Sequence, residues 1–225
     1  MEAPEPGTGS EPPRYERRYE RGREEFSRVL AFSDGLFAIA MTLLVVGIAV
    51  PTLADGEDVG ELADALNDDV SSFVSFVISF AVIGRYWVAH HDFFARLAAV
   101  DRGLIGLNLV YLMFIAFLPF PTGLLGNYFE NPLSVAVYAV AVALVSGMEV
   151  VLFAHARRAG LLGREMPDDV YRWGRLLSLS PVVFFALSIP IAFLSTTLAV
   201  TLWFLAIPFG ALAYRRKPAR ADEFF

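Results

Sequence analysis

The chain consists of long apolar runs that are separated by short polar connections. A helix that crosses a bilayer needs about 20 mostly apolar residues, because each residue advances the helix axis by about 1.5 Å across a core of about 30 Å. The pattern predicts six such spans, at residues 29–50, 70–88, 104–125, 133–154, 176–194 and 198–214. Prolines interrupt the last two spans, and membrane helices tolerate proline where neighbours satisfy the freed backbone groups. A single re-entrant pair in place of these two spans is the alternative.

Basic residues lie on alternate connections. The 18 Lys and Arg residues precede the first span, surround the second connection, and lie in the fourth connection and the tail, whereas the first, third and fifth connections contain none. Because cytoplasmic connections carry the excess of Lys and Arg, this pattern predicts an even number of spans with both termini in the cytoplasm. The first outer connection is acidic, which is typical of a soluble loop or of a mouth that concentrates cations. Its acidic residues are Asp55, Glu57, Asp58, Glu61, Asp64, Asp68 and Asp69.

Composition excludes several classes of protein. Hydrophobic residues make up 56% of the chain and charged residues 19%, with a net charge of −6, so neither a soluble single domain nor a disordered chain is expected. The absence of cysteine excludes disulfide scaffolds, thiol catalysis and cysteine metal sites. With three histidines and no HExxH or GxSxG motif, we expect no enzyme, no metal centre, no cofactor and no nucleic-acid partner.

The chain divides into three regions. Residues 1–28 are predicted to form a cytoplasmic N-terminal segment, disordered at the proline-rich start and then amphipathic, either as a solvated helix or tail or as a helix at lipid headgroups. Residues 29–214 form the six-helix transmembrane domain, and residues 215–225 form a cytoplasmic tail. Acidic residues interleave with the arginines, and this excludes a signal peptide.

Polar side chains inside the spans are costly and therefore point to function or pairing. Four of them lie at one depth, in the cytoplasmic third of the predicted bundle: Asp34, His90, Asn108 and Glu149. A buried carboxylate at Asp34 needs a partner. The candidate partners are Arg28, Arg85, His90 and His91, and Trp87 lies one helical turn before the two histidines.

The first span has two distinct faces. A helical step of 100° per residue places Thr42, Leu43 and Val46 within about 60° of Ile39, together with Phe32 and Gly35, whereas Ser33 and Asp34 point elsewhere. We name the set Ile39, Thr42, Leu43 and Val46 the stripe. Such a stripe is typical of ordinary packing against lipid or other helices, and it is also what a pore-lining face requires.

The sequence resembles the prokaryotic branch of the endolysosomal potassium channel family, transmembrane protein 175. The resemblance rests on a first-span motif, Arg28-x-x-x-Phe32-Ser33-Asp34-Gly35 followed by Ala38-Ile39-Ala40-x-Thr42-Leu43-Leu44. The second span (SFxxIGRYWxxHHxFF) and the third (NLxxLxxxxFLPFPTxLL) support it.

The resemblance implies an all-α homotetramer in the plasma membrane, with the first span of each subunit lining a central pore for K⁺ and other monovalent cations. It implies a hydrophobic constriction at Ile39, a hydroxyl ring at Thr42 that K⁺ contacts transiently, and outer layers at Leu43 and Val46. From the resemblance we expect leucine more often in relatives where this chain has Val46. The resemblance also implies a structural polar network at the inner end, formed by Arg28, Phe32, Ser33, Asp34, Trp87, His90, His91 and Asn108. The sequence contains no TVGYG-like carbonyl filter.

The alternative function is a proton-coupled transporter that uses an Asp, His and Glu relay through Asp34, His90 and Glu149. Two features of the sequence argue against it. The stripe contains no ionisable residue, and the two halves of the chain show no internal repeat.

Overall fold

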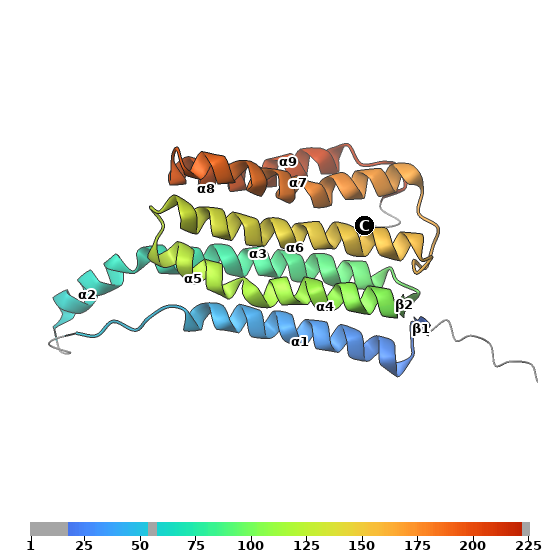
Figure 1. The fold of residues 1–225 in the computed structure, drawn as a ribbon, viewed down its shortest axis with the longest axis horizontal. Helices are drawn as coiled ribbons and strands as arrows, with labels where there is room; N and C mark the ends of the chain where they lie inside the picture. The colour runs from blue at the N-terminus through green and yellow to red at the C-terminus, as the bar shows by residue number, and fades with distance from the viewer. Residues whose placement is uncertain (1–17, 54–57, 222–225) are drawn as a thin grey trace, which may run out of the picture.

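The computed structural model describes residues 18–53 and 58–221. Several predictions therefore lie outside the described residues: the proline-rich start, Arg14 and Arg17, Asp55 and Glu57 of the acidic connection, and residues 222–225 of the tail. Within the described part, helices α1, α3 to α5, and α6 to α9 run roughly side by side in a long bundle, and α2 projects from one end of it (Figure 1).

Six helical spans have the length and hydropathy to cross a membrane, as the apolar pattern predicts. They are α1 (Glu24–Val46), α3 (Val70–Ala95), α4 with α5 (Arg102–Phe117 and Pro119–Asn127), α6 (Pro132–Arg158), α7 (Asp168–Ala192), and α8 with α9 (Thr196–Phe204 and Ala206–Arg215). Each of the last two spans is long and apolar enough to cross a membrane by itself, which favours six spans over a re-entrant pair. The chain is therefore a multi-pass membrane protein.

Proline marks the interruptions within these spans. Pro119 lacks a backbone N–H, so α4 ends at Phe117 and α5 begins with that proline in its first position. Pro181 lies inside α7 and leaves the Leu177 carbonyl without its helical donor. The Ser180 hydroxyl donates to that carbonyl at 2.8 Å. Such replacement of a lost backbone bond is what allows proline inside a membrane helix.

Helix ends differ from the predicted span ends. At the start of α1 and at the end of α3, helical hydrogen bonding continues beyond the apolar core that hydropathy marks, whereas α1 stops early at its C-cap, Gly47. The first helix begins at Glu24, four residues before the predicted domain boundary at residue 28, and ends at Val46 and not at residue 50. The second span continues to Ala95, so His90 and His91 lie inside α3 and not at its end.

Two short strands close one end of the bundle. Strand β1 (Arg18–Glu20) pairs antiparallel with β2 (Ala99–Asp101), and the Ala98 N–H donates to the Leu161 carbonyl at 2.8 Å. Residues 18–20 of the N-terminal segment are therefore a strand, where the sequence predicted a disordered to amphipathic segment. Tertiary pairing to a partner 80 residues away decides this, which local composition does not reveal. Gly22 adopts a φ of 95°, a left-handed turn that leads from β1 into α1.

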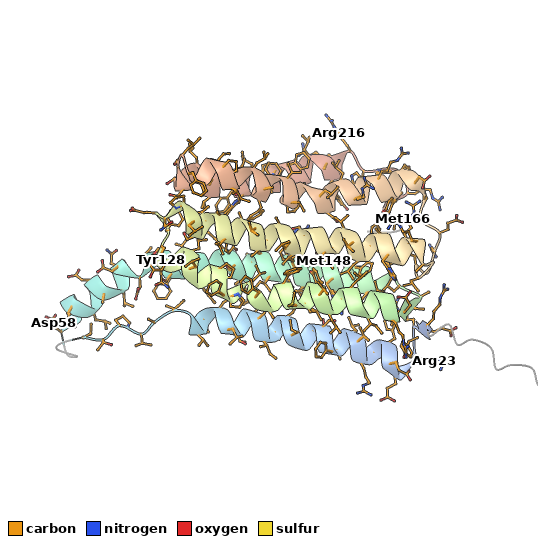
Figure 2. The ribbon with its side chains drawn as sticks, viewed as in Figure 1. Arg23, Asp58, Tyr128, Met148, Met166 and Arg216 are labelled. Atoms are coloured by element: carbon orange, nitrogen blue, oxygen red, sulfur yellow. The ribbon has the colours of Figure 1, made fainter. Side chains whose placement is uncertain are left out.

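The two ends of the bundle have opposite character. We name the end with β1, β2 and the connection between α6 and α7 the basic end. Arg23 and Met166 lie at this end, whereas Asp58 and Tyr128 lie at the other (Figure 2). Helix α2 (Val59–Asp68) lies in the acidic connection, where the sequence predicted no helix, and the Asp58 carboxylate caps it by accepting from the Gly60 N–H at 2.7 Å.

The packing order of the helices places α1 at one edge of the subunit. Helix α1 contacts α3, α4 and α5, and α6 lies between that group and α7 (Figure 1). The core between them is dominated by fully buried side chains, among them Ile83, Tyr111, Ile115 and Tyr138. One face of α1 is thus held by the subunit and the opposite face is not.

A candidate pore-lining helix and its polar network

Helix α1 divides into a packed face and an open face. The packed face consists of Phe26, Ser33, Phe37, Ala40 and Leu44, each at most 4% exposed. Spacings of three, four and seven residues put these side chains on one side of the helix. Phe37 contacts the rings of His90 on α3 and Tyr111 on α4, with centroid distances of 5.5 and 6.1 Å.

The open face contains every residue of the stripe. Ile39 is 60% exposed, Leu43 46% and Val46 74%, and Thr42 is also exposed. Phe32 lies on the same face and is 56% exposed. Large apolar side chains that the subunit leaves uncovered in a membrane protein meet lipid, another copy of the chain or a pore.

Thr42 presents its oxygen and not its proton to the open side. The Thr42 hydroxyl donates to the Ile39 carbonyl at 2.8 Å, a bond within one helical turn. The hydroxyl oxygen retains lone pairs that accept from water or contact a cation. This is the chemistry that the stripe needs if it faces ions.

A directed chain of three hydrogen bonds ties α1 to α3 and α4. His90 Nε2 lies 2.9 Å from Asn108 Oδ1, the Asn108 amide donates to Ser33 Oγ at 3.0 Å, and Ser33 Oγ donates to the Val29 carbonyl at 2.9 Å. Because the Asn108 oxygen only accepts, His90 carries a proton on Nε2. All three side chains are at most 3% exposed, so these bonds form in a dry environment and hold the inner half of α1 in one position.

Asp34 belongs to a second, separate contact. The Trp87 indole N–H donates to Asp34 Oδ1 at 2.9 Å, and the Trp87 ring lies 5.7 Å from the His91 ring. The partners predicted for Asp34 from the sequence were the ionisable residues Arg28, Arg85, His90 and His91. None of them contacts the carboxylate in the described part of the chain, because Asp34 is half-buried and a neutral donor suffices.

The predicted network is therefore two groups and not one. Ser33, Asn108 and His90 form the first, and Asp34, Trp87 and His91 form the second. Arg28 and Phe32 are exposed on α1, and in the described part of the chain neither forms a hydrogen bond or a ring contact with either group. The sequence predicts that the polar residues lie at one height. Equal height does not place two side chains on facing sides of their helices.

Sequence reasoning missed the tyrosines of the core. Tyr86 contacts Ser146 Oγ at 2.5 Å, Tyr138 contacts Ser79 Oγ at 3.0 Å, and Tyr111 donates to Glu149 at 3.5 Å. Each bond joins α6 to α3 or α4. The sequence could have indicated these bonds, because each of the three tyrosines lies within a predicted span and a buried phenol normally has a hydrogen-bond partner.

Comparison with known proteins identifies the family. The family model described as endosomal/lysosomal potassium channel TMEM175 matches residues 28–119. A protein of Chamaesiphon minutus that is named a potassium channel is 38% identical over 204 residues, covering 84% of this chain and 95% of the relative. The chain belongs to the TMEM175 family.

Two further similarities agree with TMEM175 membership. A potassium channel of Streptomyces collinus is 43% identical over 142 residues, covering 61% of this chain and 68% of the relative. The crystal structure of a TMEM175 homolog from Chamaesiphon minutus, described as lysosomal potassium-selective, aligns with a TM-score of 0.70 and 33% identity. That alignment covers 84% of this chain and 98% of the other. The matched family region contains the stripe and both polar groups.

Proposed function

We propose that the chain forms a homotetrameric, leak-type cation channel of the plasma membrane, permeable to K⁺, with α1 of each copy lining a central pore. The observation that carries this proposal is the division of α1 into a face bonded to the subunit and an open face that contains the stripe. The names of the two bacterial relatives support K⁺ as the permeant ion.

In the proposed pore, Ile39 forms the hydrophobic constriction and Thr42 the ring above it. Four isoleucine side chains offer no polar atom to a cation, so a narrow ring expels water and stops conduction. When the helices splay, the ring hydrates and ions pass. The Thr42 oxygens then replace part of the water shell of an ion. These are weak dipoles, so a preference for K⁺ over Na⁺ without a carbonyl filter is modest.

The polar groups behind α1 support positioning and not proton relay. The series of hydrogen bonds that starts at His90 passes through the side-chain amide of Asn108 and ends on the Val29 carbonyl. An amide in that position does not transfer a proton. Glu149 instead contacts Tyr111. We therefore favour passive flux over the proton-coupled transporter.

Reconstitution into liposomes with an outward K⁺ gradient tests the proposal. Through a channel, K⁺ efflux develops an inside-negative potential that opposes further efflux, and efflux continues when a protonophore lets H⁺ enter and compensate the charge. A carrier that exchanges K⁺ for H⁺ acidifies the lumen in proportion to K⁺ efflux without a protonophore. Sustained K⁺ efflux with matching acidification of the lumen in the absence of a protonophore contradicts the channel and supports the carrier.

A further inference from the structure

A groove of about 400 Å³ lies near the basic end, and its lining residues come from α4, α6 and α7. Its lining changes character along its length. The deeper part is apolar, and the part near the end of α6 carries basic and aromatic groups. The apolar lining consists of Leu107, Val150, Val151, Ala154 and Leu179, and the polar lining consists of His155, Arg158, Tyr171 and Arg175.

Two of the basic groups at this groove have no carboxylate within ion-pair distance in the described part of the chain. Nearby, Arg157 pairs with Asp168 and covers the Tyr171 ring, and His155 contacts Asp101 at 3.0 Å. Arg158 and Arg175 make no such pair among residues 18–53 and 58–221. As far as the described residues go, the groove therefore carries positive charge at one end that is paired with no carboxylate.

The predicted spans, which end at residue 154 and begin again at residue 176, place this charge at the membrane interface. Arg158 is the last residue of α6, and Val150 lies eight residues earlier, about 12 Å deeper along the helix axis. Arg175 lies one helical turn before Leu179 on α7. The basic part of the groove lies where the headgroup of an anionic lipid would be, and the apolar part lies where its acyl chain would extend into the membrane.

We propose that this groove binds an anionic phospholipid, with its phosphate between Arg158 and Arg175 and one acyl chain against Leu107, Val151 and Leu179. Planar guanidinium groups bind phosphate oxygens through paired hydrogen bonds. Basic pockets between membrane helices at the cytoplasmic side select anionic headgroups. A zwitterionic lipid brings an ammonium group that the two arginines repel, and a free phosphate gains nothing from the apolar floor. The site uses no residue of the stripe.

Native mass spectrometry of the detergent-purified full-length protein tests this assignment. Phosphatidylglycerol and phosphatidylcholine with identical acyl chains are added separately, and bound copies are counted. We expect phosphatidylglycerol to bind more tightly than phosphatidylcholine. The double variant Arg158→Gln with Arg175→Gln should weaken phosphatidylglycerol binding by about 30-fold, because the two arginines contribute about equally to the binding free energy. Phosphatidylcholine binding should not change. Arg215→Gln with Arg216→Gln is the matched control, since it removes two basic groups at the C-terminal end of α9 and neither residue lines the groove.

Two further experiments separate the contribution of the apolar lining from that of the phosphate group. Ala154→Phe keeps both arginines and fills the apolar floor, so it should also weaken phosphatidylglycerol, and it decides the question if the double variant fails to fold. Excess inorganic phosphate should not displace the lipid. The proposal is overturned if both lipids bind equally, if the control variant weakens binding as much, if Ala154→Phe has no effect, or if phosphate displaces the lipid. It is also overturned if the double variant changes the oligomer mass, since the groove is then an interface between copies.

Discussion

At the scale of single residues, Ile39 determines whether the proposed pore is wet or dry. Replacing it with asparagine offers water a hydrogen-bonding partner at the constriction. We expect Ile39→Asn to raise passive K⁺ flux in liposomes about tenfold, equivalent to lowering the barrier by about 1.4 kcal/mol, and to reduce the preference for K⁺ over Na⁺. Val77→Asn is the matched control, because Val77 on α3 is 62% exposed and Ile39 is 60% exposed. Unchanged flux in a correctly assembled Ile39→Asn oligomer rules out Ile39 as the constriction.

Thr42 contributes the only hydroxyl of the stripe. Thr42→Val preserves the branched shape and removes the oxygen, so we expect the preference for K⁺ over Na⁺ to fall about two- to fivefold, or about 0.5–1 kcal/mol, with assembly intact. Thr201→Val is the matched control, because Thr201 on α8 is also exposed and also donates within its own helix, to the Thr197 carbonyl at 2.7 Å. Equal effects of the two substitutions on the permeability ratio argue that Thr42 acts on the helix and not on the ion.

At the scale of elements, the bond between Asp34 and Trp87 braces α1 against α3. Because the donor is a neutral indole and the carboxylate is half-buried, we expect Asp34→Ala to cost about 1.5–3 kcal/mol, the range for a hydrogen bond to a charged group. Trp87→Phe should cost a similar amount, and the double variant little more than either. The thermal dissociation midpoint of the oligomer measures the loss in all three variants. Asp64→Ala on the exposed surface of α2 is the control. If the losses of the two single variants add up in the double variant, Asp34 and Trp87 do not stabilise α1 through a shared bond.

The stability of the basic end depends on pH through Asp101. Partial burial opposes its ionisation, but the Leu104 amide, His155 and Arg18 together hold the pKa of the Asp101 carboxyl below its usual value. A lowered pKa in the folded state stabilises the protein above the unfolded pKa of about 3.9, and this stability is lost as pH falls through the folded value. We expect Asp101→Asn to lower the thermal midpoint at pH 7 and to remove part of the decline below about pH 4. Asp169→Asn, at an exposed position, should leave the decline unchanged.

The sequence predicts those elements that are determined by neighbouring residues, and it does not predict those that depend on contacts between distant parts of the chain. Six spans and the two faces of α1 follow from hydropathy and a 3.6-residue period, and both are properties of neighbouring residues. The pairing of Tyr19 with Val100 in β1 and β2 joins three-residue strands with no period of their own. The partner of Asp34 was missed because helix height is readable from sequence, whereas the direction in which α3 presents Trp87 depends on packing.

At the scale of the whole molecule, one helix does not enclose a pore, so several copies must present the stripe to one axis. Closed cyclic symmetry is the usual solution, and the proposed tetramer has four times the chain mass of 24.8 kDa. We expect the measured mass of the detergent-purified protein to equal the mass of four chains. A monomer as the only species contradicts the channel.

The absence of cysteine in the chain provides a direct test of which face meets the axis. We expect Ile39→Cys to form disulfide-linked dimers under mild oxidation, because the four thiols meet at the constriction. Val183→Cys on α7 is the control, since Val183 is 53% exposed on a helix that lies across the subunit from α1, and it should remain monomeric on a denaturing gel. Cross-linking at Val183 but not at Ile39 would place α7 at the axis and remove the stripe from the pore.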